Sequence, residues 1–547
     1  MPQAAIFMKT FQPKIISTLK SYNGKSFASD LVAGIIVAII ALPLSIALAI
    51  ASGVAPEKGL YTAIVAGFVI ALFGGSRVNI SGPTAAFATI VAGIVAQYDI
   101  SGLVIATIMA GIILVIMGIC RFGGLIKFIP HTITTGFTAG IAITIAIGQL
   151  KDFMGLTYPA GTHAVETMEK LSAVARSIST INPMSILVGA IGLAILIVWP
   201  KINKKIPGSL IAVIVGTAVV KLLDLEVNTI GDLYTISRSA PTFSLPSADF
   251  AMIKELLPSA FTIAILAAIE SLLSCVVSDG MIGDKHNSNT ELIAQGLGNI
   301  CSGLFGGIPA TGAIARTAAN VKNGGKSPVA GIVHAAVLFL ILVILMPYAA
   351  WIPMPIIAAI LFMVAYNMSE WRGFVKVCKT APVGDIAVLV LTFVLTVVFD
   401  LVVAIEIGLA LTFILFLKKM TDVTDVRRWE EADGRDARLK DIPANTVVYE
   451  IDGPLFFATS DVLSKLSPDE GTKTVIIRMH NVPSLDISAL RILKQYCESC
   501  KDAGIRVIFA HICEQPMSVM KKAGFADKVG AENMAANIDE ALELVKK

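Results

Sequence analysis

Charged residues are scarce in this sequence. Asp, Glu, Lys and Arg make up 15% of its 547 residues, and the mean hydropathy is +0.78, whereas globular proteins average about 25% charged residues. Residues 31–55 and 100–120 contain no Asp, Glu, Lys, Arg or His. Each is long enough to cross a hydrocarbon core, which needs about 20 apolar residues. Comparable runs recur as far as Leu417, so the sequence predicts a polytopic protein of the lipid bilayer.

Features that indicate other classes of protein are also missing. Residues 1–30 are mixed polar and do not resemble a cleavable signal, and the net charge of +3 gives no sign of nucleic-acid binding. The seven cysteines include one CxxC, Cys497 and Cys500, without a second pair to complete a metal site. No nucleophile, base and orienting group occur together. We therefore expect no enzyme activity, no catalytic residue, no metal and no resident cofactor.

The apolar runs, divided at glycines and prolines, predict fourteen crossings or part-crossings. In the first half they lie at 31–44, 45–55, 82–97, 102–120, 128–149, 184–199 and 207–220, and residues 59–75 complete the second of them. In the second half they lie at 257–278, 291–305, 312–321, 328–346, 355–368, 384–399 and 401–417.

Basic residues indicate the orientation, because short cytoplasmic loops are enriched in Lys and Arg. With a cytoplasmic N-terminus the inward loops carry basic residues throughout, among them Arg77, Arg121, Lys201, Lys285, Lys322 and Arg372. The short outward turns 97–101 and 351–355 carry none. We therefore expect a multi-pass protein of the inner (plasma) membrane with both termini in the cytoplasm.

The character of the chain changes after Lys418. Short β-branched strands are expected at 446–450, 474–478 and 506–509, and helices at 488–503 and 515–523. Such alternation over about 100 residues is typical of a small α/β domain. The predicted divisions are a cytoplasmic N-terminal segment 1–30, a transmembrane domain 31–420, a charged linker 421–440 and a cytoplasmic domain 441–547.

Two apolar segments share one pattern. Each has a Gly-Gly pair, at Gly74 or Gly306, then residues that suit extended backbone, then a glycine, Gly82 or Gly312, before a short helix of small residues. They hold the third position in each set of seven crossings. This is the pattern of an inverted repeat with discontinuous helices.

Helix starts of this kind can bind an anion through the backbone. The first N–H groups of a helix have no internal partner, and the helix dipole places about half a positive charge there. Two such starts that meet in mid-membrane combine their effect. Small residues let an anion approach, and the candidates are Thr84, Ala85, Ala86, Gly312 and Ala313. The alternative is that these are helix-packing residues, which are common in membrane proteins.

Arg316 and Glu270 are charged residues in apolar surroundings. An arginine at this depth costs roughly 2.5–3.5 kcal/mol, which an anion, an acidic partner or snorkelling to the cytoplasmic face would offset. Glu270, with Ser274 one turn later on the same helix face, either pairs with Arg316, binds a cation or carries a proton. Each of these roles suits ion-coupled transport.

At these positions the sequence resembles the SulP family, the bacterial members of the solute carrier 26 anion transporters. The similarity covers nearly the whole chain, and its tail is similar to a STAS domain. It rests on Asp30-Leu-Val-Ala-Gly34, Ala41-Leu-Pro43, Ser81-Gly-Pro-Thr84, Glu270-Ser-Leu-Leu-Ser274, Gln295-Gly-Leu-Gly-Asn299 and Arg316-Thr317. The resemblance implies fourteen transmembrane segments in two inverted seven-helix repeats, a core domain that moves against a gate domain, a cytoplasmic α/β STAS domain and a homodimer.

The resemblance also implies roles for individual residues. It makes Leu44 and Leu48 the pocket wall, Glu270 the coupling carboxylate, and residues 84–86 and 312–316 the anion contacts, including Ile314 and Ala315. Sodium-coupled relatives use an Asp, a Thr one turn later and a Thr in the tenth helix, where this chain has Glu270, Ser274 and Ile314. Loss of that hydroxyl weakens a site for a hard cation. Co-transported protons are therefore favoured, and sodium remains possible.

One residue of the tail has a possible regulatory role. Ser488 lies in Leu485-Asp-Ile-Ser488, which resembles the loop that is phosphorylated in soluble STAS proteins. A helix N-cap at Asp486 or Ser488 would explain the same residues.

The leading hypothesis is proton-coupled import of a small inorganic anion, sulfate or bicarbonate, by an elevator-like movement of core against gate. Alternatives are a carrier of dicarboxylates such as fumarate, a sodium-coupled bicarbonate symporter and an uncoupled anion channel. A nucleobase carrier of the same fold would place acidic residues, rather than Arg316, against its ligand.

Overall fold

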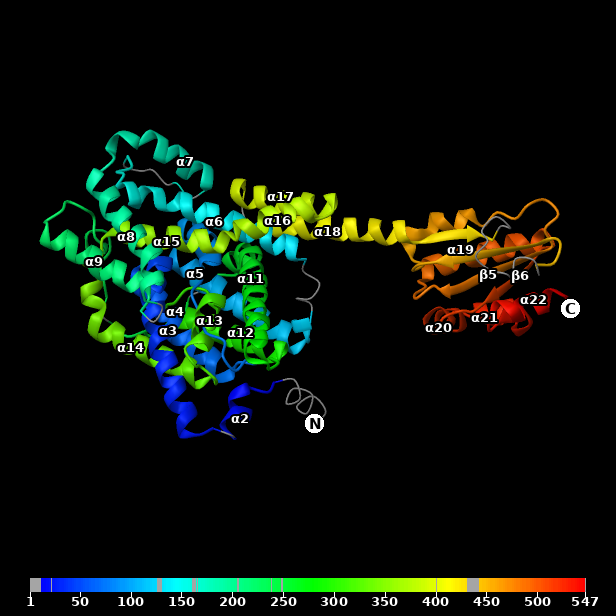
Figure 1. Ribbon diagram of the computed structural model, residues 1–547, viewed down its shortest axis with the longest axis horizontal. Helices are drawn as coiled ribbons and strands as arrows, with labels where there is room; N and C mark the ends of the chain where they lie inside the picture. The colour runs from blue at the N-terminus through cyan, green and yellow to red at the C-terminus, as the bar shows by residue number, and fades with distance from the viewer. Residues whose placement is uncertain are drawn as a thin grey trace. The chain divides into compact units, whose positions relative to one another are not determined.

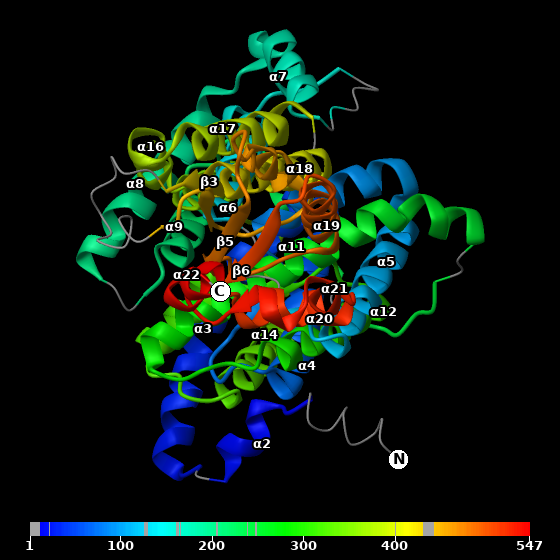
Figure 2. The ribbon, with the colours of Figure 1, turned by 90° about the vertical axis from the view of Figure 1, so that its right-hand side faces the viewer.

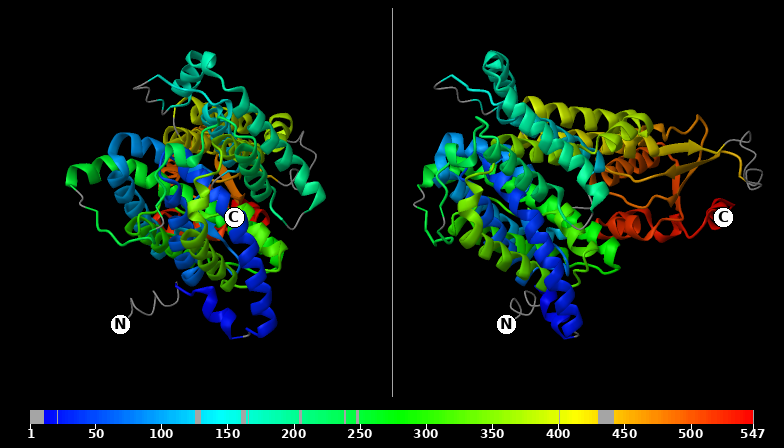
Figure 3. Two further views of the ribbon diagram at one scale, coloured as in Figure 1. Left: turned by 90° about the vertical axis from the view of Figure 1, so that its left-hand side faces the viewer. Right: turned by 60° about the vertical axis from the view of Figure 1, so that its left-hand side comes forward.

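The apolar runs form helices in the computed structural model. It describes residues 11–546 apart from 21, 125–129, 160–163, 165, 204–205, 238, 247–248, 400 and 430–441. The chain falls into two units, residues 1–409 and 410–547, and each is described by itself. The helices of both units can be followed in Figures 1 and 3.

Seven crossings make up each half of the membrane region within the described residues. The first half has α3 (Gly24–Ala51), α4 (Pro56–Phe73), α5 (Ala88–Ile119), α6 (His131–Met154), α8 (Pro183–Ile202) and α9 (Gly208–Leu222), with α5 holding two crossings. The second half has α11 (Phe250–Ile282), α12 (Ser288–Leu304), α13 (Ile314–Lys322), α14 (Val329–Ala349), α15 (Met354–Ser369), α17 (Val383–Val398) and α18 (Leu401–Val423). Among the described residues, eight helices are long and apolar enough to cross a membrane, and α9 and α17 are shorter apolar helices.

One short helix precedes these crossings and three lie between them. They are α2 (Lys14–Leu19), α7 (Thr167–Arg176), α10 (Ile230–Leu233) and α16 (Trp371–Thr380). They were not predicted, because they are too short or too polar to give a membrane signal.

The predicted division at Leu44 is wrong. Helix α3 runs without interruption from Gly24 to Ala51 with Pro43 inside it, so 31–44 and 45–55 are one crossing and α4 is the second. Proline is tolerated in membrane helices because neighbouring groups satisfy the freed carbonyl. The predicted outward turn at 97–101 appears as a kink in α5 at Asp99, whose φ is 56°.

The membrane helices sort into two groups by their packing. Helices α3, α4, α5, α11, α12, α13 and α14, here called the core group, pack mainly on one another. Helices α6, α8, α9, α15 and α17, the gate group, do the same; Figure 1 shows α6, α15 and α17 lying together. The two groups draw corresponding helices from each half of the chain, as an inverted repeat requires.

The C-terminal unit contains a five-stranded sheet of order β3-β4-β5-β6-β7. Its strands are β3 (Asp425–Arg428), β4 (Thr446–Asp452), β5 (Thr474–Asn481), β6 (Arg506–Ala510) and β7 (Met534–Ala535). Strands β4 to β7 are parallel, and β3 pairs antiparallel with β4. The predicted strands are confirmed, as are the helices α19 (Ile487–Asp502) and α20 (Glu514–Lys522).

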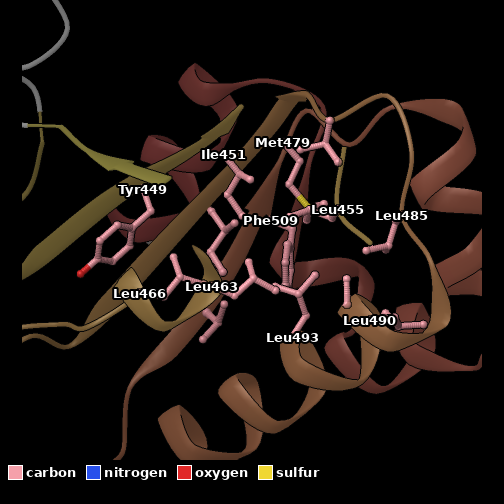
Figure 4. Packing of buried hydrophobic residues seen from close by; sticks show 14 of the residues in the cluster. Tyr449, Ile451, Leu455, Leu463, Leu466, Met479, Leu485, Leu490, Leu493 and Phe509 are labelled. Carbon is pink, nitrogen blue, oxygen red and sulfur yellow. The ribbon is translucent and has the colours of Figure 1, made fainter. Parts of the chain in front are cut away.

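Both faces of this sheet are covered, because alternate residues of a strand point to opposite faces. On one face, Tyr449 and Phe509 pack with Leu490 and Leu493 of α19 (Figure 4). On the other face, Val448 and its neighbours pack against α22 (Ile538–Lys546). Figure 2 shows α19 and α22 on either side of β5 and β6.

Part of the predicted linker 421–440 belongs to this domain. Residues 425–428 form β3, and the strand pairs with β4 from Asp425↔Asp452 to Arg428↔Tyr449. Residues 430–440 of the predicted linker lie outside the described residues.

Candidate functional site

The two repeated segments meet in the core group. Ser81–Gly82 (β1) pairs antiparallel with Thr311–Gly312 (β2), and the N–H of Ala313 donates to the carbonyl of Ile80 at 2.8 Å. Two short antiparallel strands related in this way are what an inverted repeat produces at its centre. The pairing brings residues 82–86 beside residues 312–316, as the anion-site hypothesis requires.

A helix starts directly after each strand. Thr84 is the N-cap of the short 3₁₀ turn Ala85–Phe87, which leads into α5, and Ala313 is the N-cap of α13. In the described part of the chain, no side chain caps either start. The positive end of each helix dipole therefore consists of backbone N–H groups that are not bonded to a capping side chain among the described residues. Ala85 and Ala86 are buried, whereas Ile314 and Ala315 are exposed.

Glycine is required where the two segments approach other groups. A Cβ on Gly82 would lie 2.5 Å from Nη1 of Arg316, and one on Gly312 would lie 2.7 Å from Nδ2 of Asn79. Both distances are shorter than a carbon atom tolerates without displacing its neighbour. Backbone and polar side chains therefore come together only because these positions lack a side chain.

Arg316 is buried beside this junction, with 2% of its surface exposed. Its Nη2 donates to the carbonyl of Pro83 at 2.8 Å, and its Nε and Nη1 have no hydrogen-bond partner among the described residues. The snorkelling alternative is therefore wrong. A buried guanidinium with two nitrogens left over is expected to bind an acceptor.

Glu270 approaches from α11 and is half-buried. Its Oε2 accepts a hydrogen bond of 2.8 Å from Oγ1 of Thr84, the residue that begins the first helix start. Glu270 and Arg316 form no ion pair within 4.0 Å in the described structure, so a structural salt bridge between them is also excluded. The site thus contains a carboxylate and a guanidinium that do not pair with each other.

From the sequence, Ser274 was expected to act together with Glu270, but its hydroxyl group contacts other residues. Its Oγ donates to Oδ1 of Asn79 at 2.8 Å and lies 3.1 Å from Oγ1 of Thr317, and no bond joins it to Glu270. Thr317 also donates to Asn79 at 3.0 Å. Helix α13 therefore brings a hydroxyl group to Ser274 through Thr317, although Ile314 has none.

Sequence reasoning missed the buried carboxylate that holds this region together. Glu291 of α12 is 0% exposed and accepts hydrogen bonds from the N–H groups of Gly75 and Ser76 at 2.9 and 3.2 Å. It also accepts from Asn79 at 2.7 Å and Gln295 at 3.0 Å. The available signal was an acid at the start of an apolar run, which is costly in a membrane unless satisfied.

The other predicted residues occupy two further places. Leu48 is buried and Leu44 half-buried on α3, which packs against α13 and α5. Ser488 is the second residue of α19, and the N-cap is Asp486, whose Oδ1 accepts from the N–H of Ala489 at 2.8 Å. The N-cap explanation therefore applies to Asp486 and not to Ser488. In the described part of the chain no cluster of His, Cys, Asp and Glu could hold a metal ion.

The arrangement defines a class of multi-pass membrane transporter, with two discontinuous segments and a buried cation at the centre of an inverted repeat. Residues 27–392 match the model of the Sulfate permease family, and residues 438–541 match that of the STAS domain. The chain belongs to the sulfate permease family. It is an anion transporter of this family and not an enzyme.

Three comparisons illustrate the similarity. The chain is 40% identical over 530 residues to "Putative sulfate transporter YvdB" of Bacillus subtilis, covering 95% of this chain and 98% of the relative. The transmembrane domain of a cyanobacterial bicarbonate transporter, BicA, superimposes with a TM-score of 0.64 at 31% identity, over 70% of this chain and 98% of that one. Murine Slc26a9, an anion transporter in the inward-facing state, gives a TM-score of 0.89 at 19% identity, over 99% and 95% of the chains. This last likeness concerns the fold alone.

Proposed function

We propose that the protein takes up a small inorganic anion, sulfate or bicarbonate, by proton-coupled symport. The observation that carries the proposal is the buried guanidinium of Arg316, whose Nε and Nη1 have no hydrogen-bond partner in the described structure. It lies beside two helix starts that no side chain caps. An oxyanion would accept hydrogen bonds from these groups and neutralise the buried charge.

Glu270 would couple protons to this anion. Its carboxylate is bound to Thr84, which begins one of the two helix starts. A negative charge there repels an anion, and the repulsion is strong where water is excluded. Protonation removes that charge, so proton and anion would bind together and leave together.

The movement that carries the loaded site across the membrane would be elevator-like. All the site residues lie on core-group segments, whereas α6, α8, α9, α15 and α17 form the gate group. A rigid core that slides past the gate would move the site without breaking its hydrogen bonds. We also propose that the protein lies in the plasma membrane with both termini cytoplasmic, because this orientation puts the loops rich in Lys and Arg on the cytoplasmic side. The homodimer is proposed from the family resemblance alone.

Sodium-coupled bicarbonate symport is the second candidate. It is favoured by Thr317, which brings a hydroxyl from α13 to within 3.1 Å of Ser274, since sodium prefers hard oxygen ligands. Both hydroxyls are already bonded to Asn79, so a sodium site would require them to change partners.

The test is uptake of labelled sulfate, bicarbonate and fumarate into proteoliposomes under an imposed proton or sodium gradient. We expect a proton gradient to drive uptake of an inorganic anion, and Glu270→Gln to abolish this while anion exchange persists. Glu406→Gln, at an exposed position of α18, is the matched control. Uptake driven only by sodium would favour the second candidate. Preference for fumarate would show a dicarboxylate carrier. Uptake of the anion that is unchanged in Glu270→Gln would show a channel.

A further inference from the structure

A groove lies on the membrane unit, apart from the anion site. It has a volume of about 620 Å³ and lies between α3, α9 and α14. Helix α3 contributes Leu42, Pro43 and Ile46, and the remaining walls come from α9 and from the end of α14 with the residues that follow it. Its lining is almost wholly carbon, so it offers little to a water-soluble ligand.

The groove opens toward lipid rather than toward water. Ile214 of α9 is 55% exposed and Tyr348 of α14 is 56% exposed, and both line it. In a chain that crosses the bilayer, large apolar side chains exposed along the crossings face hydrocarbon. The occupant that fits such a groove is therefore an acyl chain.

One end of the groove is cationic. Lys221, in the last turn of α9, places its Nζ 3.6 Å from the centroid of the Trp351 ring, and Tyr348 packs edge-on against the same ring at 5.3 Å. Lys221 forms no ion pair with an acidic side chain among the residues that the structure describes. Trp, Tyr and Lys gather at the level of lipid headgroups, and the ammonium group of a lysine there pairs with a lipid phosphate.

We propose that the groove binds one anionic glycerophospholipid. The headgroup phosphate lies at Lys221, and an acyl chain runs along Pro43 and Ile46. The order of charge and hydrocarbon along the groove matches the order of phosphate and acyl chain in such a lipid.

This lipid would bridge the two helix groups. Helix α9 belongs to the gate group, whereas α3 and α14 belong to the core group, and α3 also carries Leu44 and Leu48. A lipid bound here would contact both groups, so its presence or absence would change the rate at which one group slides past the other. That consequence rests on the proposed elevator movement, but the binding itself does not.

The test uses purified full-length protein in nanodiscs that contain phosphatidylglycerol or phosphatidylcholine with a photoactivatable diazirine in one acyl chain. Adducts are mapped by mass spectrometry. We expect phosphatidylglycerol to label α3, α9 and α14 within the groove, and Lys221→Gln to reduce that labelling about fivefold, the factor for the loss of one exposed ion pair worth about 1 kcal/mol. Lys221→Arg should restore it, and Lys201→Gln, an exposed basic residue of α8, should leave it unchanged.

A second pair of variants tests the apolar part of the groove. Ala218→Trp fills it, whereas Val215→Trp, on the same helix but outside the lining, is the matched control. Labelling that is lost only in Ala218→Trp supports the site. Equal labelling by both lipids, labelling that ignores Lys221, or labelling that survives Ala218→Trp would overturn it. Because no arm measures transport, failure here is distinct from failure of the coupling proposal.

Discussion

The two units of the protein differ in the partners of their charged side chains. In the STAS domain, acids pair with bases near the surface, as Asp425 does with Lys465 and Glu450 with Arg478. In the membrane unit, Glu291 accepts hydrogen bonds from amides and backbone N–H groups, and two nitrogens of Arg316 have no partner among the residues that the structure describes. A paired arginine would have no capacity left for an anion. In the membrane unit the buried acid thus has its acceptor oxygens occupied, whereas the buried cation keeps unpaired donors among the described residues, as the proposed anion site requires.

The largest effect is expected at Glu291. Its replacement by Ala leaves four donors without an acceptor, two from the backbone at Gly75 and Ser76 and two from Asn79 and Gln295. The expected cost is about 3 kcal/mol or more, since each buried unsatisfied group costs roughly 1–3 kcal/mol. Thermal unfolding and size-exclusion profiles in detergent would measure the loss of folded protein. Glu406→Ala, at an exposed position, should be neutral; equal stability of the two variants would refute a scaffold role for Glu291.

Substitution of Arg316 should change anion transport and leave the folding of the protein unchanged. Arg316→Gln removes the charge and its donors, so we expect KM for the anion to rise roughly tenfold to a hundredfold, because hydrogen bonds to charged groups contribute about 1.5–3 kcal/mol. Arg316→Lys keeps the charge but loses the planar fork and should recover only part of the affinity. The measurement is initial uptake against anion concentration, with Tm as the folding control. A wild-type KM in Arg316→Gln would place the anion elsewhere.

A smaller effect is expected from Gly82→Ala. The added Cβ would lie 2.5 Å from Nη1 of Arg316, and the end of a flexible side chain can move aside. We expect KM to rise about tenfold, which corresponds to an overpacking cost near 1.4 kcal/mol. Gly93→Ala in α5, where nothing lies within 4 Å of the added carbon, is the control. A change of the same size in both variants would point to helix flexibility instead of a displaced guanidinium.

The smallest effect is expected in the STAS domain. A hydrogen bond from Lys465 lowers the pKa of Asp425 below its ordinary value, although burial opposes this. A depressed folded pKa adds stability above the unfolded pKa of about 3.9, and that stability is lost as the pH falls through the folded pKa. Because the two side chains are 58% and 45% exposed, Asp425→Asn should cost less than about 1 kcal/mol at pH 7 and nothing at pH values below the folded pKa.

Denaturant unfolding of a fragment of residues 421–547 would measure this effect, since Trp429 is the single tryptophan in that range. Asp502→Asn, an exposed acid, is the control. A large cost at Asp425, or one that persists in acid, would contradict the view that surface pairs contribute little here.

Local patterns were enough to predict most of the fold and the place of the site. Short runs of β-branched residues located β4, β5 and β6, and the Gly-Gly repeats located β1 and β2. The crossing at Pro43 was divided wrongly because proline is read as a break, whereas packing inside the membrane tolerates it. Strand β3 was read as linker because its charged residues, Arg427 and Arg428, do not alternate with apolar ones.

The sequence by itself determined that the chain crosses the membrane many times, that a small α/β domain follows, and that two matched segments and a buried arginine belong together. These depend on composition and period, which are properties of neighbouring residues. Only the tertiary structure decided that Glu270 binds Thr84 and not Arg316, that Ser274 belongs to the Asn79 network, and that Glu291 is an acceptor for four donors. Apart from the bond between Gln295 and Glu291 within α12, these hydrogen bonds join residues about 200 positions apart. They depend on how helices are placed side by side, and no local pattern encodes that placement.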